Sequence, residues 1–138
     1  MRGDAGADVD GVLPADQSTI LLAEDDVAQR LLYTRILIGA GYYVLGADNG
    51  DDALETARRE LPDLVLMDVT MPGRDGWSTA RALKDDERTR HIPVVLMTGH
   101  TGDAADAAAR ASGCNEMLGK PIPVRSLLAA VETYAPHR

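Results

Sequence analysis

The sequence is poor in the residues that cross-link secreted proteins and bind zinc. It has one cysteine, Cys114, and three histidines among 138 residues. A single thiol cannot close a disulfide within the chain, and no group of Cys and His residues has the spacing of a zinc site. These absences favour a reducing compartment, and we expect the protein to be cytoplasmic.

Positive charge and long apolar runs are also scarce. The chain has 14 Lys and Arg against 22 Asp and Glu, which gives a net charge of −8. A negative chain is a poor partner for a phosphate backbone. No apolar run reaches the roughly 18 residues that a membrane span needs. We therefore expect no direct binding to nucleic acid and no membrane association.

The length and composition fit one globular domain with short tails. Residues 1–17 hold four aspartates against one arginine and lack the apolar core of a signal peptide. We predict a flexible acidic tail over 1–17, a folded domain over 18–135 and a C-terminal tail over 136–138. Because the chain stops soon after its last helical pattern, we expect no DNA-binding or enzymatic output domain.

From residue 19 onward, short apolar runs alternate with helical patterns. This alternation is typical of βαβ units, and the uninterrupted apolar runs indicate strands that are covered on both faces. We predict strands over 19–23, 42–46, 64–68, 93–98 and 115–119. We predict helices over about 27–39, 51–60, 77–86, 103–111 and 124–131. Six of the nine residues in 103–111 are alanine, so this helix should be weakly docked and mobile.

Polar residues follow four of the predicted strands. They are Glu24, Asp25 and Asp26 after the first strand, Asp68 at the end of the third, Thr98 at the end of the fourth and Lys120 after the fifth. The carboxyl ends of parallel strands lie at one edge of the sheet, where ligands bind. Two carboxylates 4 Å apart repel by roughly 4 kcal/mol at an effective dielectric of 20, so the acids call for a cation. Oxygen ligands with an open face suit Mg²⁺.

Six short motifs in order resemble the receiver domain of bacterial two-component response regulators. They are LLAEDD at 21–26, ADNG at 47–50, LMD at 66–68, MPGRDG at 71–76, MT at 97–98 and KPI at 120–122. The match runs from about residue 19 to residue 135. It implies an α/β, flavodoxin-like, doubly wound sheet of five parallel strands in the order 2-1-3-4-5, with five helices in three layers, as in chemotaxis members of this family.

The resemblance also implies the chemistry. Asp68 would be the phosphoacceptor, taking a phosphoryl group from a sensor histidine kinase or a phosphotransfer protein. Asp25, Asp68 and the backbone carbonyl of Thr70 would bind Mg²⁺ directly, and Glu24 would act largely through water. The chain would then be a signalling domain and not an enzyme, catalysing only its own phosphotransfer and dephosphorylation.

Two further residues complete the switch that the resemblance implies. Lys120 would supply a second positive charge to the phosphoryl group, on a Lys120–Pro121 peptide bond that the resemblance suggests is cis. Thr98 would hydrogen-bond a phosphoryl oxygen and draw its loop inward. A downstream protein would bind the face made by the 103–111 helix, the fifth strand and the last helix. The expected state is a monomer or a weak dimer that forms on phosphorylation.

One position departs from the family pattern. Met117 stands three residues before Lys120, where the family has Tyr or Phe as a rotating aromatic residue. A thioether lacks the shape and polar tip of that residue. We therefore predict that coupling runs through movement of the alanine-rich helix or of the Thr98 loop. The family tunes phosphoryl lifetime at the positions of Thr70 and His100.

Other interpretations of these residues remain open. Asp25 or Asp26 could cap the first helix, and Asp68 could be a solvated acid at a strand end. A pseudo-receiver would dock partners without phosphorylation. A haloacid-dehalogenase-like phosphatase also uses an Asp nucleophile with Mg²⁺, but it needs an acid two residues further on, where Thr70 stands, and it places the nucleophile on the first strand.

Overall fold

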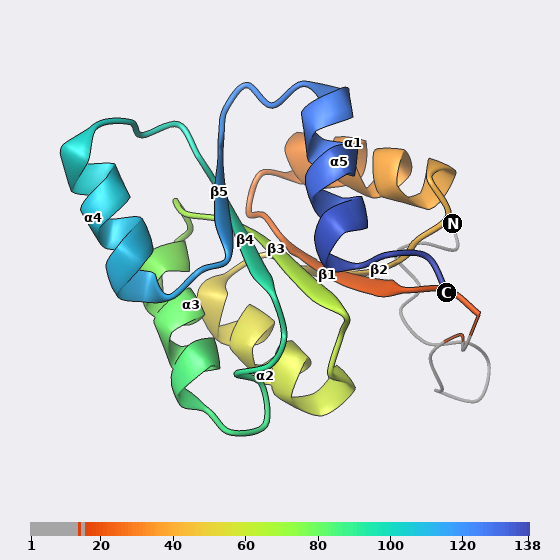
Figure 1. The fold of residues 1–138 in the computed structure, drawn as a ribbon, viewed down its shortest axis with the longest axis horizontal. Coiled ribbons are helices and arrows are strands. Elements are labelled where there is room, and N and C mark those ends of the chain that lie inside the picture. The colour runs from red at the N-terminus through yellow and green to blue at the C-terminus, as the bar shows by residue number, and fades with distance from the viewer. Residues whose placement is uncertain (1–13, 15) are drawn as a thin grey trace.

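A computed structural model of the chain describes residue 14 and residues 16–138. Most of the predicted acidic tail over 1–17 lies outside the described residues. The remainder forms a five-stranded parallel sheet in the order β2-β1-β3-β4-β5, with helices on both faces (Figure 1). The strands are β1 (Thr19–Ala23), β2 (Tyr43–Ala47), β3 (Leu64–Asp68), β4 (Val94–Thr98) and β5 (Glu116–Gly119). The helices are α1 (Val27–Gly39), α2 (Gly50–Glu60), α3 (Gly76–Asp85), α4 (Asp103–Ser112) and α5 (Val124–Tyr134). The predicted fold class and strand order are confirmed.

Two hydrophobic cores lie on opposite faces of the sheet, because successive strand residues point to opposite sides. Leu21 on β1 packs into the core beneath α2 and α3, whereas its neighbour Leu22 packs into the core beneath α1 and α5. Every residue of β1, β3 and β4 is buried. The uninterrupted apolar runs in the sequence correspond to these three inner strands.

Asparagine and aspartate side chains begin three of the helices. Asp26, Asn49 and Asp75 each accept a hydrogen bond from the backbone N–H three residues further on. Such caps satisfy backbone donors that the helix itself leaves free. The helix predicted over 51–60 begins one residue earlier, because Asn49 is the cap and Gly50 is the first residue of α2. The carboxylate that caps α1 is Asp26, which leaves Asp25 free of that structural role.

Helix α4 buries few of its residues. Only Ala105 and Ser112 of this helix are buried, and its first turn lacks a side-chain cap. It packs on α3 and lies at one side of the molecule, with Arg81 of α3 donating to the carbonyl of Ala111 at 3.1 Å (Figure 1). The small buried set agrees with the weak docking that the alanine content predicts.

The end of the chain packs against the sheet on the side opposite the β-strand carboxyl ends. The ring of His137 stacks on Tyr42 with centroids 4.4 Å apart, and Arg138 pairs with Asp63 at 2.7 Å. The predicted C-terminal tail over 136–138 thus makes specific contacts. Across the described part of the chain, each helix is too short or too polar to cross a bilayer.

Candidate functional site

The ammonium group of Lys120 lies at the centre of the polar cluster at the carboxyl edge of the sheet. It donates to Oδ2 of Asp68 at 2.6 Å, to Oε1 of Gln29 at 2.9 Å and to Oε1 of Glu24 at 3.2 Å. The Lys120–Pro121 peptide bond is cis, as the resemblance suggested. Charge-assisted bonds of this length are strong where water is largely excluded. Lys120 therefore contacts two side chains, those of Asp68 and Glu24, that lie 52 and 96 positions earlier in the sequence.

Asp68 ends β3, the central strand of the sheet, and the residue is only 6% exposed. Its second carboxylate oxygen, Oδ1, accepts from the backbone N–H of Thr70 at 3.0 Å. Thr98 ends the neighbouring strand β4 and is 1% exposed. Its hydroxyl oxygen accepts from the N–H of His100 at 2.9 Å, and a hydroxyl that accepts one bond can still donate another.

Three carboxylates meet beside Lys120. Glu24, Asp25 and Asp68 each place an oxygen within 4.8 Å of the other two. Glu24 is 1% exposed and Asp68 is nearly as buried, whereas Asp25 faces solvent. A donor set made only of oxygen, with one open side, fits Mg²⁺, which keeps part of its water shell. The chain therefore brings together the acids that the sequence predicted as metal ligands.

The environment of these acids favours an added cation. Burial raises the pKa of Glu24 to about 7, an effect that the backbone N–H of Asp26 opposes and the neighbouring carboxylate of Asp68 reinforces. Burial also opposes the charged form of Lys120, but the carboxylates of Asp68 and Glu24 outweigh it and raise the pKa of Lys120 above its ordinary value. One ammonium thus faces several acids, and negative charge remains in excess.

The loop after β3 is held by close backbone packing. A Cβ on Gly76 would lie 2.5 Å from the carbonyl oxygen of Asp68 and 2.7 Å from Cα of Val69, so only glycine fits there. Arg74 in the same loop pairs with Asp51 of α2 at 3.0 Å. These contacts fix the segment that carries Thr70.

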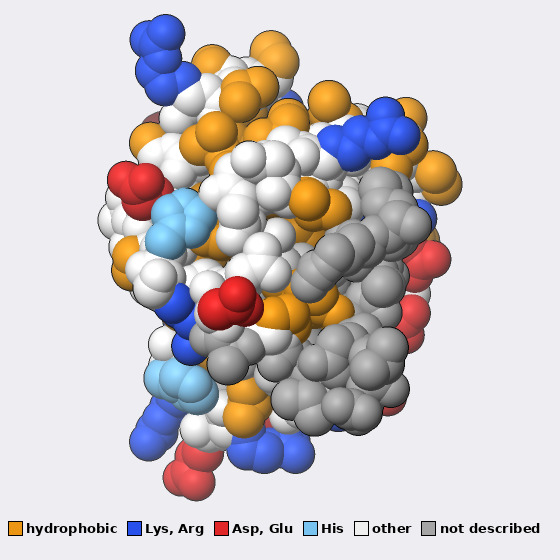
Figure 2. All heavy atoms as spheres, turned by 90° about the vertical axis from the view of Figure 1, so that its right-hand side faces the viewer, with side chains coloured by type: hydrophobic (Ala, Val, Ile, Leu, Met, Phe, Trp, Pro, Cys, Tyr) orange, Lys and Arg blue, Asp and Glu red, His pale blue; other side chains and the backbone are white. Residues whose placement is uncertain are grey.

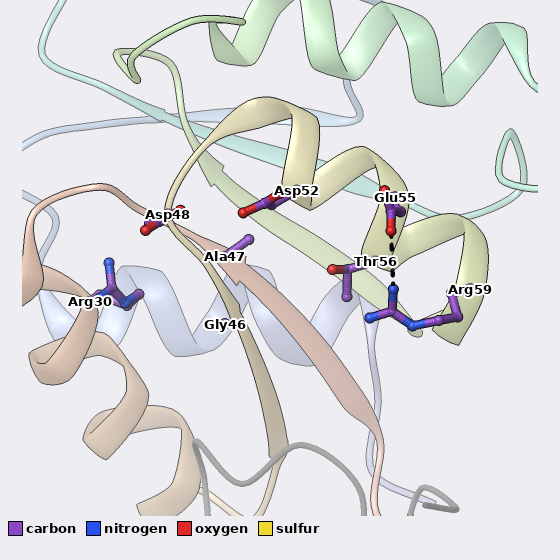
Figure 3. A pocket seen from close by; sticks show the side chains of 8 residues that line it. All are labelled: Arg30, Gly46, Ala47, Asp48, Asp52, Glu55, Thr56 and Arg59. Atoms are coloured by element: carbon purple, nitrogen blue, oxygen red, sulfur yellow. Dashed lines mark ion pairs between the residues drawn. The ribbon is translucent and has the colours of Figure 1, made fainter.

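Two hollows flank this site. A groove of about 480 Å³ runs between α1 and α5 and includes Lys120, Tyr33 and Leu127 in its lining. Figure 2 shows hydrophobic side chains gathered over the upper part of the molecule, where α1 and α5 lie. A second hollow of about 490 Å³ lies between α1 and α2 beside the end of β2 (Figure 3). The second hollow lacks Asp68, Thr98 and Lys120, so we place the candidate site at the polar cluster.

Two contacts of the site were not predicted from the sequence. Gln29 of α1 bonds Lys120, and Arg30 donates to the backbone carbonyl of Glu24 at 2.7 Å. Both follow the acidic stretch by one helical turn, which is the signal that could have placed them near it. Their partners could not be read from spacing, because Gln29 and Lys120 are 91 residues apart.

Known proteins are similar to this chain in sequence and in fold. A family model described as the response regulator receiver domain matches residues 20–132. The chain belongs to this family. Response regulator PleD of Caulobacter vibrioides is 42% identical over 117 residues, which are 84% of this chain and 26% of PleD. Polar-differentiation response regulator DivK of Brucella anthropi is 32% identical over 116 residues, which are 84% of this chain and 94% of DivK.

Solved receiver domains superimpose on this one. The receiver domain of sensor histidine kinase PA1611 from Pseudomonas aeruginosa has a TM-score of 0.80 at 27% identity, over 86% of this chain and 97% of that one, with a magnesium ion in its active-site cleft. The receiver domain of a signal transduction histidine kinase from Syntrophus aciditrophicus has a TM-score of 0.81 at 30% identity, over 85% and 89% of the two chains.

Membership of the family settles the class of function. A receiver domain is a signalling domain of two-component systems, and not a metabolic enzyme. Its family accepts phosphoryl groups, binds Mg²⁺ in the active site and interacts with histidine kinases or phosphotransfer proteins. The phosphatase alternative is disfavoured as well by the place of Asp68 on the third strand and by Thr70 two residues later.

Proposed function

We propose that this receiver domain accepts a phosphoryl group on Asp68. The observation that carries the proposal is the meeting of Asp68 with Lys120 at 2.6 Å and with the oxygens of Glu24 and Asp25 within 4.8 Å. A carboxylate oxygen of Asp68 attacks the phosphorus of a phosphohistidine donor. The phosphorus–nitrogen bond breaks, its electron pair stays on the imidazole, and an aspartyl phosphate forms.

The residues that would hold Mg²⁺ are Asp25, Asp68 and the backbone carbonyl of Thr70, with Glu24 acting through water. Bound there, the ion offsets the repulsion between a carboxylate and an incoming phosphoryl group. Asp25 suits this role because it is exposed and does not cap α1. Gly76 supports the same role, since it lets the loop that carries Thr70 lie close to the end of β3.

Lys120 and Thr98 act on the charge of the phosphoryl group. The ammonium of Lys120 lies 2.6 Å from Oδ2 of Asp68 and would stabilise the negative charge that develops on the phosphoryl group. The hydroxyl of Thr98, at the end of the adjoining strand, would donate to a phosphoryl oxygen. This hydrogen bond would pull the segment from Thr98 to His100 toward Asp68. Phosphorylation of the buried site would in this way change the conformation of the surface.

Two surfaces would serve two partners. The groove between α1 and α5 opens beside Lys120, and three apolar residues on those two helices, Val27, Leu32 and Val124, are each more than half exposed. We assign it to the protein that donates the phosphoryl group, because a phosphohistidine must reach Asp68 from a surface next to the site. The downstream partner would bind the face of α4, β5 and α5, and the domain would be a monomer or a weak phosphorylation-dependent dimer.

Incubation with Mg²⁺ and a small acyl phosphate tests the proposal. We expect intact-mass measurement to show one labile phosphoryl group on the wild-type chain, and none on Asp68→Asn or after chelation of Mg²⁺. A wild-type chain that gains no phosphoryl group would support the pseudo-receiver alternative and overturn the proposal. Sustained turnover of a phosphate ester would instead revive the phosphatase alternative.

A further inference from the structure

Three side chains accept a hydrogen bond from the Lys120 ammonium, and only that of Gln29 is not an acid. An ammonium group has three protons to donate, and those of Lys120 go to Asp68, Glu24 and Gln29. Since an ammonium cannot accept, it is the carbonyl oxygen of the Gln29 amide that faces it. Two of the three acceptors, Asp68 and Glu24, are acids that would face Mg²⁺ and the phosphoryl group. Gln29 is not one of these acids.

The backbone of Gln29 is itself fixed. It lies in the first turn of α1, and its N–H donates to the capping carboxylate of Asp26 at 3.0 Å. The side chain is half-buried and lies at the rim of the groove between α1 and α5. A long side chain on a capped helix end loses less freedom when it bonds a partner than one on a mobile loop does. The backbone of Gln29 is therefore fixed before its side chain bonds Lys120.

We propose, on the basis of the function proposed above, that Gln29 is a positioning residue that holds the Lys120 ammonium beside Asp68 during phosphoryl transfer. When Asp68 takes up the phosphoryl group, the bond from Lys120 to Gln29 would keep the ammonium group in place. Because the amide is neutral, it adds no repulsion to an anionic donor, unlike a fourth carboxylate at this position.

If Gln29 had a purely structural role, substitution at this residue would have a different effect on Lys120. Methionine has a similar length and helix propensity, and it would fill the same space at the rim of the groove. If Gln29 acts only by packing, Gln29→Met should leave Lys120 unchanged. If Gln29 acts as an acceptor, Gln29→Met should release Lys120, and Gln29→Glu should retain it.

The composition of the chain makes a direct test simple. It has two lysines, Lys84 and Lys120, so labelling with ¹⁵N-lysine gives two side-chain ammonium signals. In the Mg²⁺-loaded protein we expect Gln29→Met to move and broaden the Lys120 signal, and Gln29→Glu to keep it sharp. The Lys84 signal is the internal control, because Lys84 donates to the carbonyl of Ile92 in another part of the fold.

A second readout links the bond to the chemistry. With Mg²⁺ and a small acyl phosphate, we expect Gln29→Met to slow phosphorylation about tenfold, the factor for losing one hydrogen bond to a charged group. The chain's other glutamine gives a matched control. Gln17→Met removes a side-chain bond to the carbonyl of Gly41, near the amino end of β2, and should not change the rate.

The two proposals fail in different ways. A wild-type chain that takes up no phosphoryl group overturns the function proposed for Asp68, whatever Gln29 does. A wild-type chain that is phosphorylated, with an unchanged Lys120 signal and an unchanged rate in Gln29→Met, overturns the role of Gln29 alone. Loss of the Lys120 signal in Gln29→Glu would also overturn it, since that variant keeps an acceptor.

Discussion

The backbone N–H of Lys120 donates to the carbonyl oxygen of Thr98 at 2.7 Å. This bond extends the ladder in which Thr98 pairs with Gly119, so the chain positions of the two residues are fixed by the sheet. Their side-chain tips, and the loop that follows Thr98, remain to respond to a new group on Asp68. The site is thus prearranged by strand pairing, and small changes at the tips should have large effects on its chemistry.

Removal of the Lys120 charge tests this arrangement. We expect Lys120→Met to slow phosphorylation from a small acyl phosphate by roughly 10²- to 10³-fold, the usual loss for one prearranged donor. Lys84→Met is the control, because Lys84 is the only other lysine and lies outside the site. Rates are measured by intact mass at fixed Mg²⁺. Equal rates in Lys120→Met and wild type would contradict the role of Lys120.

The loop after β3 should tolerate no side chain at residue 76. In Gly76→Ala the new Cβ meets the backbone of Asp68 and Val69, and overpacking of this kind costs about 1 to 3 kcal/mol of unfolding free energy. Because the loop carries Thr70, Mg²⁺ binding should weaken as well. Denaturant unfolding with and without Mg²⁺ measures both effects.

Gly39→Ala is the control for this substitution. A Cβ on Gly39, at the end of α1, would meet no atom within 4 Å, so the variant should be as stable as wild type or slightly more so. Equal stability and equal Mg²⁺ affinity in Gly76→Ala and Gly39→Ala would show that the loop can shift freely.

The response to phosphorylation should appear in α4 and in the loop after β4. Met117 is a half-buried thioether on β5, where the resemblance implies that an aromatic residue is usual, and α4 buries only two of its residues. We expect a phosphoryl mimic with Mg²⁺ to shift backbone amide signals most over residues 98–112. Arg81→Ala, which removes a bond to the last turn of α4, should enlarge those shifts. Spectra of this face that stay unchanged with the mimic would refute the prediction.

The pH dependence of stability should include a contribution from Asp86. Its carboxylate accepts from Arg88, and from Arg58 of α2 at 2.8 Å. The hydrogen bonds from Arg88, aided by Arg58, hold the pKa of Asp86 below its ordinary value of 3.8. The folded state therefore binds fewer protons than the unfolded state below about pH 4, so this contribution is complete above that pH and is lost as pH falls.

We expect Asp86→Asn to lower the melting temperature at pH 7 and to approach the wild-type value as pH falls below about 4. Asp85→Asn is the control, since the Asp85–Arg81 pair is exposed on both sides and such pairs contribute little. A melting-temperature difference for Asp86→Asn that is the same at pH 7 and at pH 2 would exclude the assigned cause.

The sheet and the meeting of the acids could be predicted from sequence because both depend on short-range patterns. Apolar runs such as 64–68 match inner strands residue for residue, and polar residues after those runs must meet where parallel strands end. Five starts differ from the predicted ones by one residue, since β2, β4 and β5 begin one residue later and α2 and α3 one residue earlier. Tyr42 precedes β2, and Gly50 joins α2 because Asn49 supplies its cap.

The contacts of Lys120 beyond Asp68 could not be predicted in this way. Whether Gln29 or another residue of α1 faces Lys120 depends on the rotation and packing of α1 against the sheet, which a single-sequence pattern does not fix. The contact of Arg138 with Asp63 was likewise not predictable, because the two residues are 75 positions apart and no sequence motif links them. Such long-range side-chain partners are set by how whole elements pack, which no short sequence pattern specifies.

Reductive trapping of the phosphorylated chain tests the central claim most directly. Borohydride converts an aspartyl phosphate to homoserine, which tandem mass spectrometry locates in a peptide. After treatment with Mg²⁺ and a small acyl phosphate, we expect homoserine at residue 68 and unmodified aspartate at residues 25 and 26. Homoserine at Asp25 or at another acid, with Asp68 unchanged, would contradict the claim that Asp68 is the phosphoacceptor.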